Sequence, residues 1–259
     1  MLSVVINTYN HEKTLPLVLH GYRMQSDQDF EIVIADDGSS DKTIEIALQF
    51  PYPLDIQVCS HGHKGEKVAT CFNRGAALAK GEHLLFTQGD VIPARNLIER
   101  HKQKLEIGIV TVGPMHLLPR HADIRLDQIE KESFSDYEED SRIRENLFIH
   151  DVVESEEPWH YIWTSNCACT AKDFQGIGGF SEAYNGIWGG HDTDWAYRMH
   201  LLGCKFSSVM HSPVYHIWHP IEKPEPDAQG WIPAMHLFQE KIFEYGDSEI
   251  WRDPNGIFS

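Results

Sequence analysis

The sequence has few of the features that mark secreted or membrane-bound proteins. No apolar run approaches the ~20 residues that a membrane-spanning helix needs. Met1 leads directly into a strand-like segment and not into a basic leader, so we expect neither a signal peptide nor a membrane anchor. The five cysteines form an odd set without framework spacing. Such a set is typical of reduced thiols and predicts a cytoplasmic protein.

Positive charge is also scarce, because 22 Lys and Arg residues face 39 Asp and Glu residues and the formal net charge is −17. Such a chain repels nucleic acid and anionic membranes, so neither is expected as a bulk partner. A small anionic ligand stays compatible with this charge, since a metal ion can bridge acidic protein to phosphate. Peripheral docking of the tail on a membrane stays open, although no basic or amphipathic segment requires it. The oligomeric state is not predicted.

What the chain does contain is an alternation of apolar strands and amphipathic helices. Strand-like runs occur at 2–7, 30–35, 54–58 and 107–115, and a further run starts at 83 and ends at Asp90. Helical patterns cover 15–22, 42–48 and 66–79, and Pro93 is expected to begin another helix. This alternation predicts an α/β fold with a single, mostly parallel sheet flanked by helices.

The stretch around Asp90 organises the site that we expect. The apolar run from 83 ends in Gln88-Gly89-Asp90, so a carboxylate sits at the carboxyl end of a buried strand. Open α/β sheets bind ligands at that edge, and the polar turns at 8–10 and 36–41 belong to the same edge. Asp90 is therefore a candidate metal ligand. The alternative is a plain turn that caps a helix.

Two stretches of the second half carry further candidate residues. Asp192 lies in the segment 188–194, where a helix begins whose dipole favours an ionised carboxylate, and the alternative is a plain helix cap. His216 and His219 could join Asp90 as metal ligands. Positions three apart on a regular strand face opposite ways, so both can bind only if the chain turns there. We therefore favour His219, and two packed or surface histidines are the alternative.

Taken together, these segments resemble a family 2 glycosyltransferase of the GT-A fold. The resemblance covers roughly residues 2–115 and 160–220. The segments that carry it are the opening strand and turn at 4–10, the Asp-Asp-Gly-Ser turn at 36–41, the helix from Gly65-Glu66-Lys67 to 73–75, the metal motif at 88–90, the segment 188–194 shared with the galactosyltransferase-type C-terminal region, and the histidines at 216–219.

The resemblance implies an inverting transferase that moves a hexose or N-acetylhexosamine from a UDP-sugar to a hydroxyl acceptor (a glycan, lipid-linked glycan or glycoconjugate), with Mn²⁺ or Mg²⁺ as cofactor. It implies Asp192 as the general base. Asp36 resembles the residue that binds uracil N3, and Lys67 is our choice for a phosphate contact. The implied donor-binding residues are Thr8, Tyr9, Asn10, Asp36, Asp37, Lys67, Gln88 and Gly89. The implied metal ligands are Asp90, His219 and His216, and the implied acceptor-binding residues are Trp188, Gly190, His191 and Asp194, the last of which either orients the acceptor or holds Arg198.

Two departures from the family pattern keep a second function open. Gln88 stands where the metal motif has its first acid, and His191 stands where the family has a glutamate. They would suit a catalytically degenerate, nucleotide-sugar-binding module. A nucleotidyltransferase would need a Gly-rich basic loop after the first strand, whereas this chain has 8–11 as Thr-Tyr-Asn-His. A His/Asp metallohydrolase has little support in the order of the motifs.

We accordingly predict one domain over residues 1–259. Residues 1–115 form its nucleotide-sugar-binding half, and residues 161–220 form its catalytic and acceptor-binding half. The acidic segment 116–160 is expected to be an insertion, helical or partly mobile, that covers one face of the cleft, with a solvated surface excursion as the alternative. Residues 221–259 form a C-terminal extension with a short helix near 233–245.

Overall fold

A computed structural model describes residues 1–51, 53–62, 67–144, 148–149, 152–153, 155–219 and 228–245. Gly65 and Glu66 of the donor motif, and most of the predicted extension, lie outside these residues. The helices are α1 (Leu15–Arg23), α2 (Thr43–Gln49), α3 (Val68–Leu78), α4 (Leu97–Lys104), α5 (Leu126–Lys131), α6 (Ser141–Arg144), α7 (Ala171–Gly176), α8 (His191–Leu201) and α9 (Ala228–Glu244), with short 3-10 turns at Pro158–Tyr161 and Glu182–Tyr184. The strands are β1 (Leu2–Thr8), β2 (Phe30–Asp36), β3 (Ile56–Ser60), β4 (His83–Gln88), β5 (Val91–Pro93), β6 (Ile109–Val112), β7 (Met115–Leu117), β8 (Phe148–Ile149), β9 (Val152–Val153), β10 (Cys167–Thr170), β11 (Lys205–Ser208) and β12 (Val214–His216).

The main sheet confirms the predicted α/β fold. Its strand order in the described chain is β3-β2-β1-β4-β10-β6-β11-β9-β8. The strands β3, β2, β1 and β4 are parallel to one another, and β6 and β11 run in the same direction. The inserted strand β10 is antiparallel to both β4 and β6. The carboxyl ends of the parallel strands therefore meet at one edge of the sheet.

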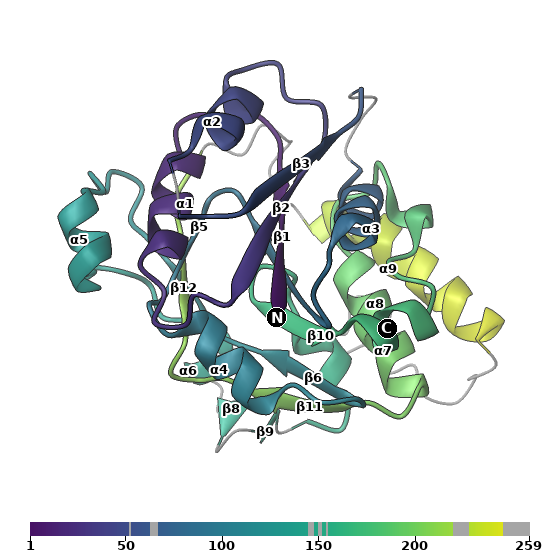
Figure 1. Ribbon diagram of the computed structural model, residues 1–259. Coiled ribbons are helices and arrows are strands. Elements are labelled where there is room, and N and C mark those ends of the chain that lie inside the picture. Colours follow the sequence, from purple (N-terminus) through teal and green to yellow (C-terminus); the bar gives the residue numbers. More distant parts are fainter. Residues whose placement is uncertain are drawn as a thin grey trace.

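Helices cover both faces of this sheet (Figure 1). The buried apolar residues form two core clusters, each made of strand and helix residues. One cluster contains Phe72 of α3, Phe86 of β4 and Trp195 of α8. The other contains Leu19 of α1 and Ile98 of α4. Because β1 and β2 are covered on both faces, their central residues, 4–6 and 32–35, form continuous apolar runs and do not alternate, as expected for parallel strands.

A second, small sheet with the order β5-β12-β7 corrects two expectations. Pro93 does not begin a helix. It ends the strand β5, opposite Val214, and the helix α4 starts at Leu97. The run 107–115 is not one strand, because it breaks between β6 and β7. Gly113 there donates its backbone N–H to the Asn166 carbonyl, and Pro114 has no N–H to offer a sheet.

The acidic segment 116–160 contains the short helices α5 and α6. The helix α5 packs beside α1, where Ile129 joins the second core cluster. The segment also adds β8 and β9 to the end of the main sheet. Arg142 anchors this segment. Its side chain is 2% exposed, forms an ion pair with Asp140 at 2.6 Å, and donates to the carbonyl oxygens of Gly113 and Tyr161.

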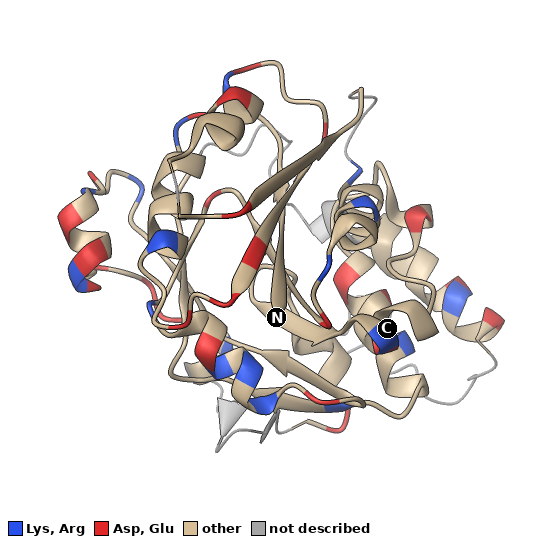
Figure 2. Ribbon diagram, in the orientation of Figure 1, with Lys and Arg blue, Asp and Glu red and all other residues tan. Residues whose placement is uncertain are grey.

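Acidic side chains are spread over many elements, and Lys and Arg residues likewise occur on several elements, among them α4 (Figure 2). Among the described residues, no helix is both long enough and apolar enough to cross a membrane. All five cysteines are free thiols, as the odd count predicted. The helix α9 begins at Ala228 and includes Pro233, so it is longer than the short helix expected near 233–245.

Candidate active site

The candidate site lies at the edge where β1, β2, β3 and β4 end. The turn after β4 contains Gly89 and Asp90, and β5 follows this turn directly. The strand β12 of the small sheet pairs with β5. The backbone N–H of Ile217 donates to the Asp90 carbonyl at 2.8 Å, so the segment after β12 is fastened to the turn after β4. This pairing brings residues that are more than a hundred positions apart into one place.

Three histidines converge on one carboxylate oxygen of Asp90. The Nε2 atoms of His219, His216 and His11 lie 3.0, 3.4 and 3.9 Å from Asp90 Oδ2. Burial acts to raise the pKa of Asp90, but hydrogen bonds from His216 and His219 outweigh it and bring the pKa well below its usual range. Burial lowers the pKa of His11. The carboxylate is therefore ionised, and His11 is neutral at pH 7.

The residues of this group fit a divalent cation. Asp90 is only 4% exposed, and its Oδ1 atom is buried and finds no hydrogen-bond donor among the described residues. A buried carboxylate oxygen without a donor is costly, and a cation would remove that cost. Ligand atoms of Asp90, His216 and His219 all lie within 4.8 Å of one another. A carboxylate with two imidazoles is a ligand set typical of Mn²⁺ and its neighbours among the transition metals.

The chain does turn between the two histidines. His216 is the last residue of β12, and Ile217 to His219 leave the strand, so both imidazoles reach the same carboxylate. The acidic segment supports this turn. Leu118 N–H donates to the His216 carbonyl at 2.9 Å, and the Arg120 guanidinium lies 4.6 Å from the centre of the Trp218 ring.

The sequence reasoning missed His11. This residue follows Asn10, whose φ of 55° turns the chain sharply after β1. Gly89 allows its close approach, because a Cβ atom at Gly89 would collide with His11 Nδ1. The signal was present in the sequence, since His11 directly follows the first polar turn at the ligand-binding edge.

The two acids of the second turn have different surroundings. Both oxygens of Asp36 are occupied, because they accept hydrogen bonds from the Thr8 and Ser60 hydroxyls, from the Ser39 hydroxyl and backbone, and from Gly38 N–H. Asp37 Oδ2 accepts one hydrogen bond from Lys67 N–H at 3.0 Å. Asp36 thus holds the turn in shape, whereas Asp37 follows the strand end and lies beside the start of α3.

The first and second turns are joined by their side chains. Asn10 Oδ1 accepts from Ser40 N–H at 2.9 Å, and Asn10 N–H donates to the Ser39 hydroxyl at 2.8 Å. Thr8 is fully buried, and its hydroxyl donates to Asp36 Oδ1 at 3.1 Å. Tyr9, between these residues, is partly exposed.

The start of α8 reaches the same edge through two hydrogen bonds. Thr87 at the end of β4 donates to the Ser165 carbonyl at 2.9 Å, and Thr164 Oγ1 lies 3.3 Å from His191 Nε2. Asp192 follows in the first turn of α8, half-buried, with its Oδ1 atom accepting from Thr193 N–H at 3.0 Å. Burial raises the pKa of Cys167 on β10, and the charge of the Asp192 carboxylate acts in the same direction.

Asp194 is buried and contacts Arg198, one of the two partners expected for it. Its side chain is 0% exposed, and its Oδ2 atom binds the Arg198 guanidinium at 2.7 and 2.9 Å. Its Oδ1 atom accepts from the Tyr245 hydroxyl at 2.9 Å. Asp194 thus ties α8 to the end of α9 and presents no surface to an acceptor.

The remaining acceptor candidates flank the start of α8. Trp188 is 37% exposed. Gly190 has a φ of 77°, and a Cβ atom there would lie 2.8 Å from the Tyr184 ring, so this position requires glycine. The ring of His191 lies near Phe72 and Phe180, with centroid distances of 6.5 and 6.1 Å.

Comparison with known proteins identifies the family. Residues 3–141 match the sequence profile described as glycosyl transferase family 2, and residues 149–220 match the one described as the N-terminal domain of galactosyltransferase. Validoxylamine A glucosyltransferase from Streptomyces hygroscopicus subsp. limoneus is 30% identical over 220 residues, which cover 78% of this chain and 48% of that protein. Chondroitin synthase from Escherichia coli is 25% identical over 263 residues, which cover 93% of this chain and 38% of that protein.

The chain thus spans about half, or less, of the length of these curated relatives. Among solved structures, S. aureus TarS 1–349 in complex with UDP-GlcNAc is similar with a TM-score of 0.71 at 15% identity, covering 93% of this chain and 66% of that chain. Identity at that level shows the shared GT-A fold alone. The first profile match extends over more than half of the 259 residues. This chain belongs to glycosyl transferase family 2.

Proposed function

We propose that this enzyme is an inverting, metal-dependent glycosyltransferase that moves a hexose or N-acetylhexosamine from a UDP-sugar to a hydroxyl group of a glycan or glycoconjugate. The observation that carries the proposal is the convergence of His216 and His219 on Asp90, at the edge that also holds Asp37. The UDP-GlcNAc bound by TarS, which shares the fold, supports a UDP-sugar as donor.

In this proposal the donor lies along the strand ends. Asp37 and Tyr9 contact the uracil base, while Thr8, Asn10 and Asp36 fix the turns that position them. We choose Asp37 over Asp36 because hydrogen bonds already occupy both oxygens of Asp36. Gln88 and Gly89 lie beside the sugar or ribose hydroxyls.

The diphosphate needs positive charge, and the proposal gives it two sources. Lys67 at the start of α3 contributes a flexible point charge. Mn²⁺ or Mg²⁺ held by Asp90, His216 and His219 would neutralise the negative charge that develops on the departing diphosphate. The low pKa of Asp90 keeps this carboxylate available as a ligand at all physiological pH values.

The acceptor approaches from the side of α8. Asp192 takes the proton of the attacking hydroxyl, a step that typically contributes ~10²–10⁴-fold to the rate. Asp192 lies in the first turn of α8, half-buried. Trp188 offers a flat apolar face to a sugar ring. A single base, with direct attack on the anomeric carbon, gives inversion of configuration.

The test is release of UDP from a panel of UDP-sugars, with Mn²⁺ or with EDTA. We expect metal-dependent release from one sugar, lost in Asp192→Asn and retained in Asp127→Asn, a matched change at an exposed acid on α5. Slow hydrolysis of the donor makes this measurement independent of the acceptor. A protein that binds no nucleoside diphosphate in the presence of Mn²⁺ contradicts the proposal.

Gln88 and His191 favour a second candidate, a nucleotide-sugar-binding module without turnover, since both replace acids of catalytic motifs. Metal-dependent UDP binding without release from any donor would support it. In that case, the double change Gln88→Asp with His191→Glu should restore UDP release.

A further inference from the structure

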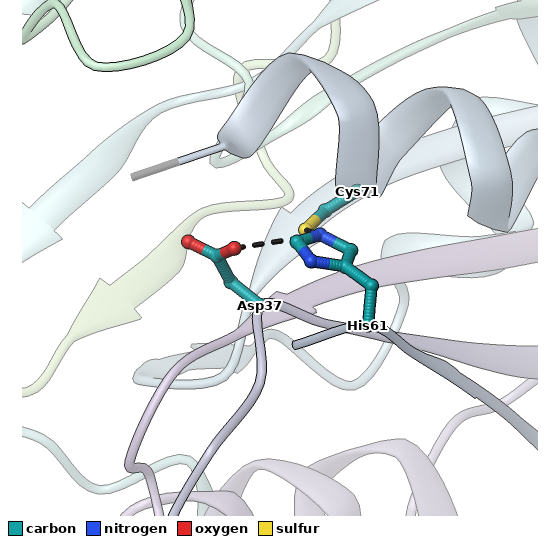
Figure 3. A group of neighbouring side chains, drawn as sticks. All are labelled: Asp37, His61 and Cys71. Atoms are coloured by element: carbon teal, nitrogen blue, oxygen red, sulfur yellow. Dashed lines mark hydrogen bonds and ion pairs between the residues drawn. The ribbon is translucent and has the colours of Figure 1, made fainter. Parts of the chain in front are cut away.

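A second group of side chains that could bind a metal ion lies at the same sheet edge, at the ends of β2 and β3. Asp37 follows β2, His61 follows β3, and Cys71 is on α3, and the three side chains point toward one another (Figure 3). His61 Nε2 lies 3.4 Å from Asp37 Oδ1 and 3.3 Å from Cys71 Sγ. The three ligand atoms lie within 4.8 Å of one another.

The imidazole of His61 is oriented as a metal ligand. Its Nδ1 atom lies 3.2 Å from the Gly62 carbonyl, which accepts a hydrogen bond in the tautomer that carries the hydrogen on Nδ1. In that tautomer the Nε2 atom has a lone pair, and it faces a carboxylate oxygen and a thiol. Metal-binding histidines characteristically donate their other N–H to a carbonyl or carboxylate in this way.

The same geometry argues against a nucleophilic triad. In a triad the acid binds one ring nitrogen and the nucleophile lies against the other. Here Asp37 and Cys71 both approach Nε2 of His61, while the backbone of Gly62 occupies Nδ1. Three ligand atoms that converge on one point suit the binding of an ion. A proton relay would instead need the acid and the nucleophile at opposite ring nitrogens.

The spacing matches tetrahedral zinc. With the usual zinc bond lengths to nitrogen, oxygen and sulfur, the N–O edge of the tetrahedron is about 3.4 Å and the N–S edge about 3.6 Å. The corresponding distances from His61 Nε2 are 3.4 Å to Asp37 and 3.3 Å to Cys71. An ion could therefore enter with small side-chain shifts. The ligands are also shielded, since the side chains of His61 and Asp37 are 10% and 5% exposed and Cys71 is 1% exposed.

We propose that Asp37, His61 and Cys71 form a second divalent-cation site that selects a thiophilic ion such as Zn²⁺, with its fourth position open to water. When the zinc–sulfur bond forms, the thiol proton of Cys71 passes to solvent, because only the thiolate is a ligand. The Asp90 group contains carboxylate and imidazoles alone, so the two sites differ in the softness of their ligands.

One consequence rests on the function proposed above. Asp37 is the carboxylate assigned to the uracil base, so an ion at this site and the donor nucleotide compete for it. Zn²⁺ would therefore weaken UDP binding. The chain would then have one cation site that strengthens binding of the UDP-sugar and another that weakens it.

The test uses Co²⁺ as a spectroscopic substitute for Zn²⁺ on the full chain, under reducing conditions. We expect a thiolate-to-cobalt charge-transfer band at one equivalent, abolished by Zn²⁺ addition. The band should be lost in Cys71→Ser and in His61→Gln. It should persist in Cys59→Ser, a matched change at the neighbouring thiol, and in Asp90→Asn, which disables the other group. Circular dichroism establishes that each variant is folded.

Absence of the band in the wild type, or its persistence in Cys71→Ser, would overturn the site. These outcomes do not depend on UDP, so they are distinct from failure of the proposed function. The competition is tested separately by titrating UDP with Mg²⁺ present. Zn²⁺ should lower UDP affinity at least tenfold in the wild type but not in Cys71→Ser, and an equal effect of Zn²⁺ on both proteins would refute competition at this site.

Discussion

Two aspartates in the first turn of α8 should respond to the same substitution in opposite ways. Asp194→Asn removes the charge that faces Arg198, whose side chain is 12% exposed and also donates to the carbonyls of Ile177 and Gly179. Breaking a buried ion pair from one side typically costs about 3–5 kcal/mol, because the remaining charge stays buried. Asp192→Asn keeps the oxygen that accepts from Thr193 N–H and loses only the favourable interaction of a charge with the helix dipole, about 0.3–1 kcal/mol.

Urea unfolding followed by tryptophan fluorescence measures the two free energies, and UDP release measures the two activities. We expect Asp194→Asn to be strongly destabilised yet active per folded molecule, and Asp192→Asn to be stable but slowed by about 10²–10⁴-fold. The double variant Asp194→Leu with Arg198→Met removes both charges and should recover much of the lost stability. Equal losses of stability in the two asparagine variants would refute the assignment of separate roles.

Three further outcomes are expected. His219→Ala and His216→Ala should each raise the Mn²⁺ concentration needed for half-maximal UDP release by roughly tenfold or more, measured by metal titration. Asp37→Asn should weaken UDP binding in calorimetry with little change in stability, whereas Asp36→Asn, which loses acceptors for several buried donors, should lower the free energy of unfolding by about 1–3 kcal/mol. Burial lowers the pKa of His101 to about 4, so the unfolded chain binds a proton there between pH 6.5 and 4 that the folded chain does not. Stability should therefore fall as pH falls through that window, by up to roughly 3 kcal/mol from this group, and urea unfolding of His101→Gln should show a smaller loss.

Much of the sheet could be predicted because its central strands are buried on both faces. The strands β1, β2 and β4 appear as continuous apolar runs, and the helices between them have clear amphipathic patterns. The small sheet could not be predicted, since β5, β7 and β12 have three residues each and are too short for any periodicity. Their pairing depends on contacts between distant segments, such as Ala94 N–H with the Pro213 carbonyl.

The candidate site was predictable where a motif coincides with a strand end, as for Asp90. It was not predictable where the direction of a side chain decides its role. Asp36 and Asp37 are adjacent, yet the strand geometry directs the first into a network of turn donors and leaves the second beside His61. Whether His216 can reach Asp90 together with His219 depended on whether the chain leaves β12 at that residue, and the sequence alone does not tell this.

The buried position of Arg142 in the acidic segment could not be predicted for a different reason. Arg142 lies among acids and would be assigned to the surface from composition, but it is buried, with its guanidinium 3.7 Å from the centre of the Trp163 ring. Its partners are Asp140, two residues away, and carbonyls at Gly113 and Tyr161. Only the folded chain brings these acceptors together, so a local pattern cannot reveal them.

The strand order also determines how a nucleotide could lie across the site. Asp37 and His61 follow β2 and β3, whereas His11 and Asp90 follow β1 and β4, in the sheet order β3-β2-β1-β4. Neighbouring strands are about 4.8 Å apart, so the ends of β2 and β4 are separated by two such steps, or about 10 Å. In the proposed binding mode, a base held at Asp37 would have its diphosphate over β1 and toward Asp90, where the proposed metal ligands lie. The reverse orientation would move the diphosphate away from His216 and His219, because β12 reaches the edge only beside the turn after β4.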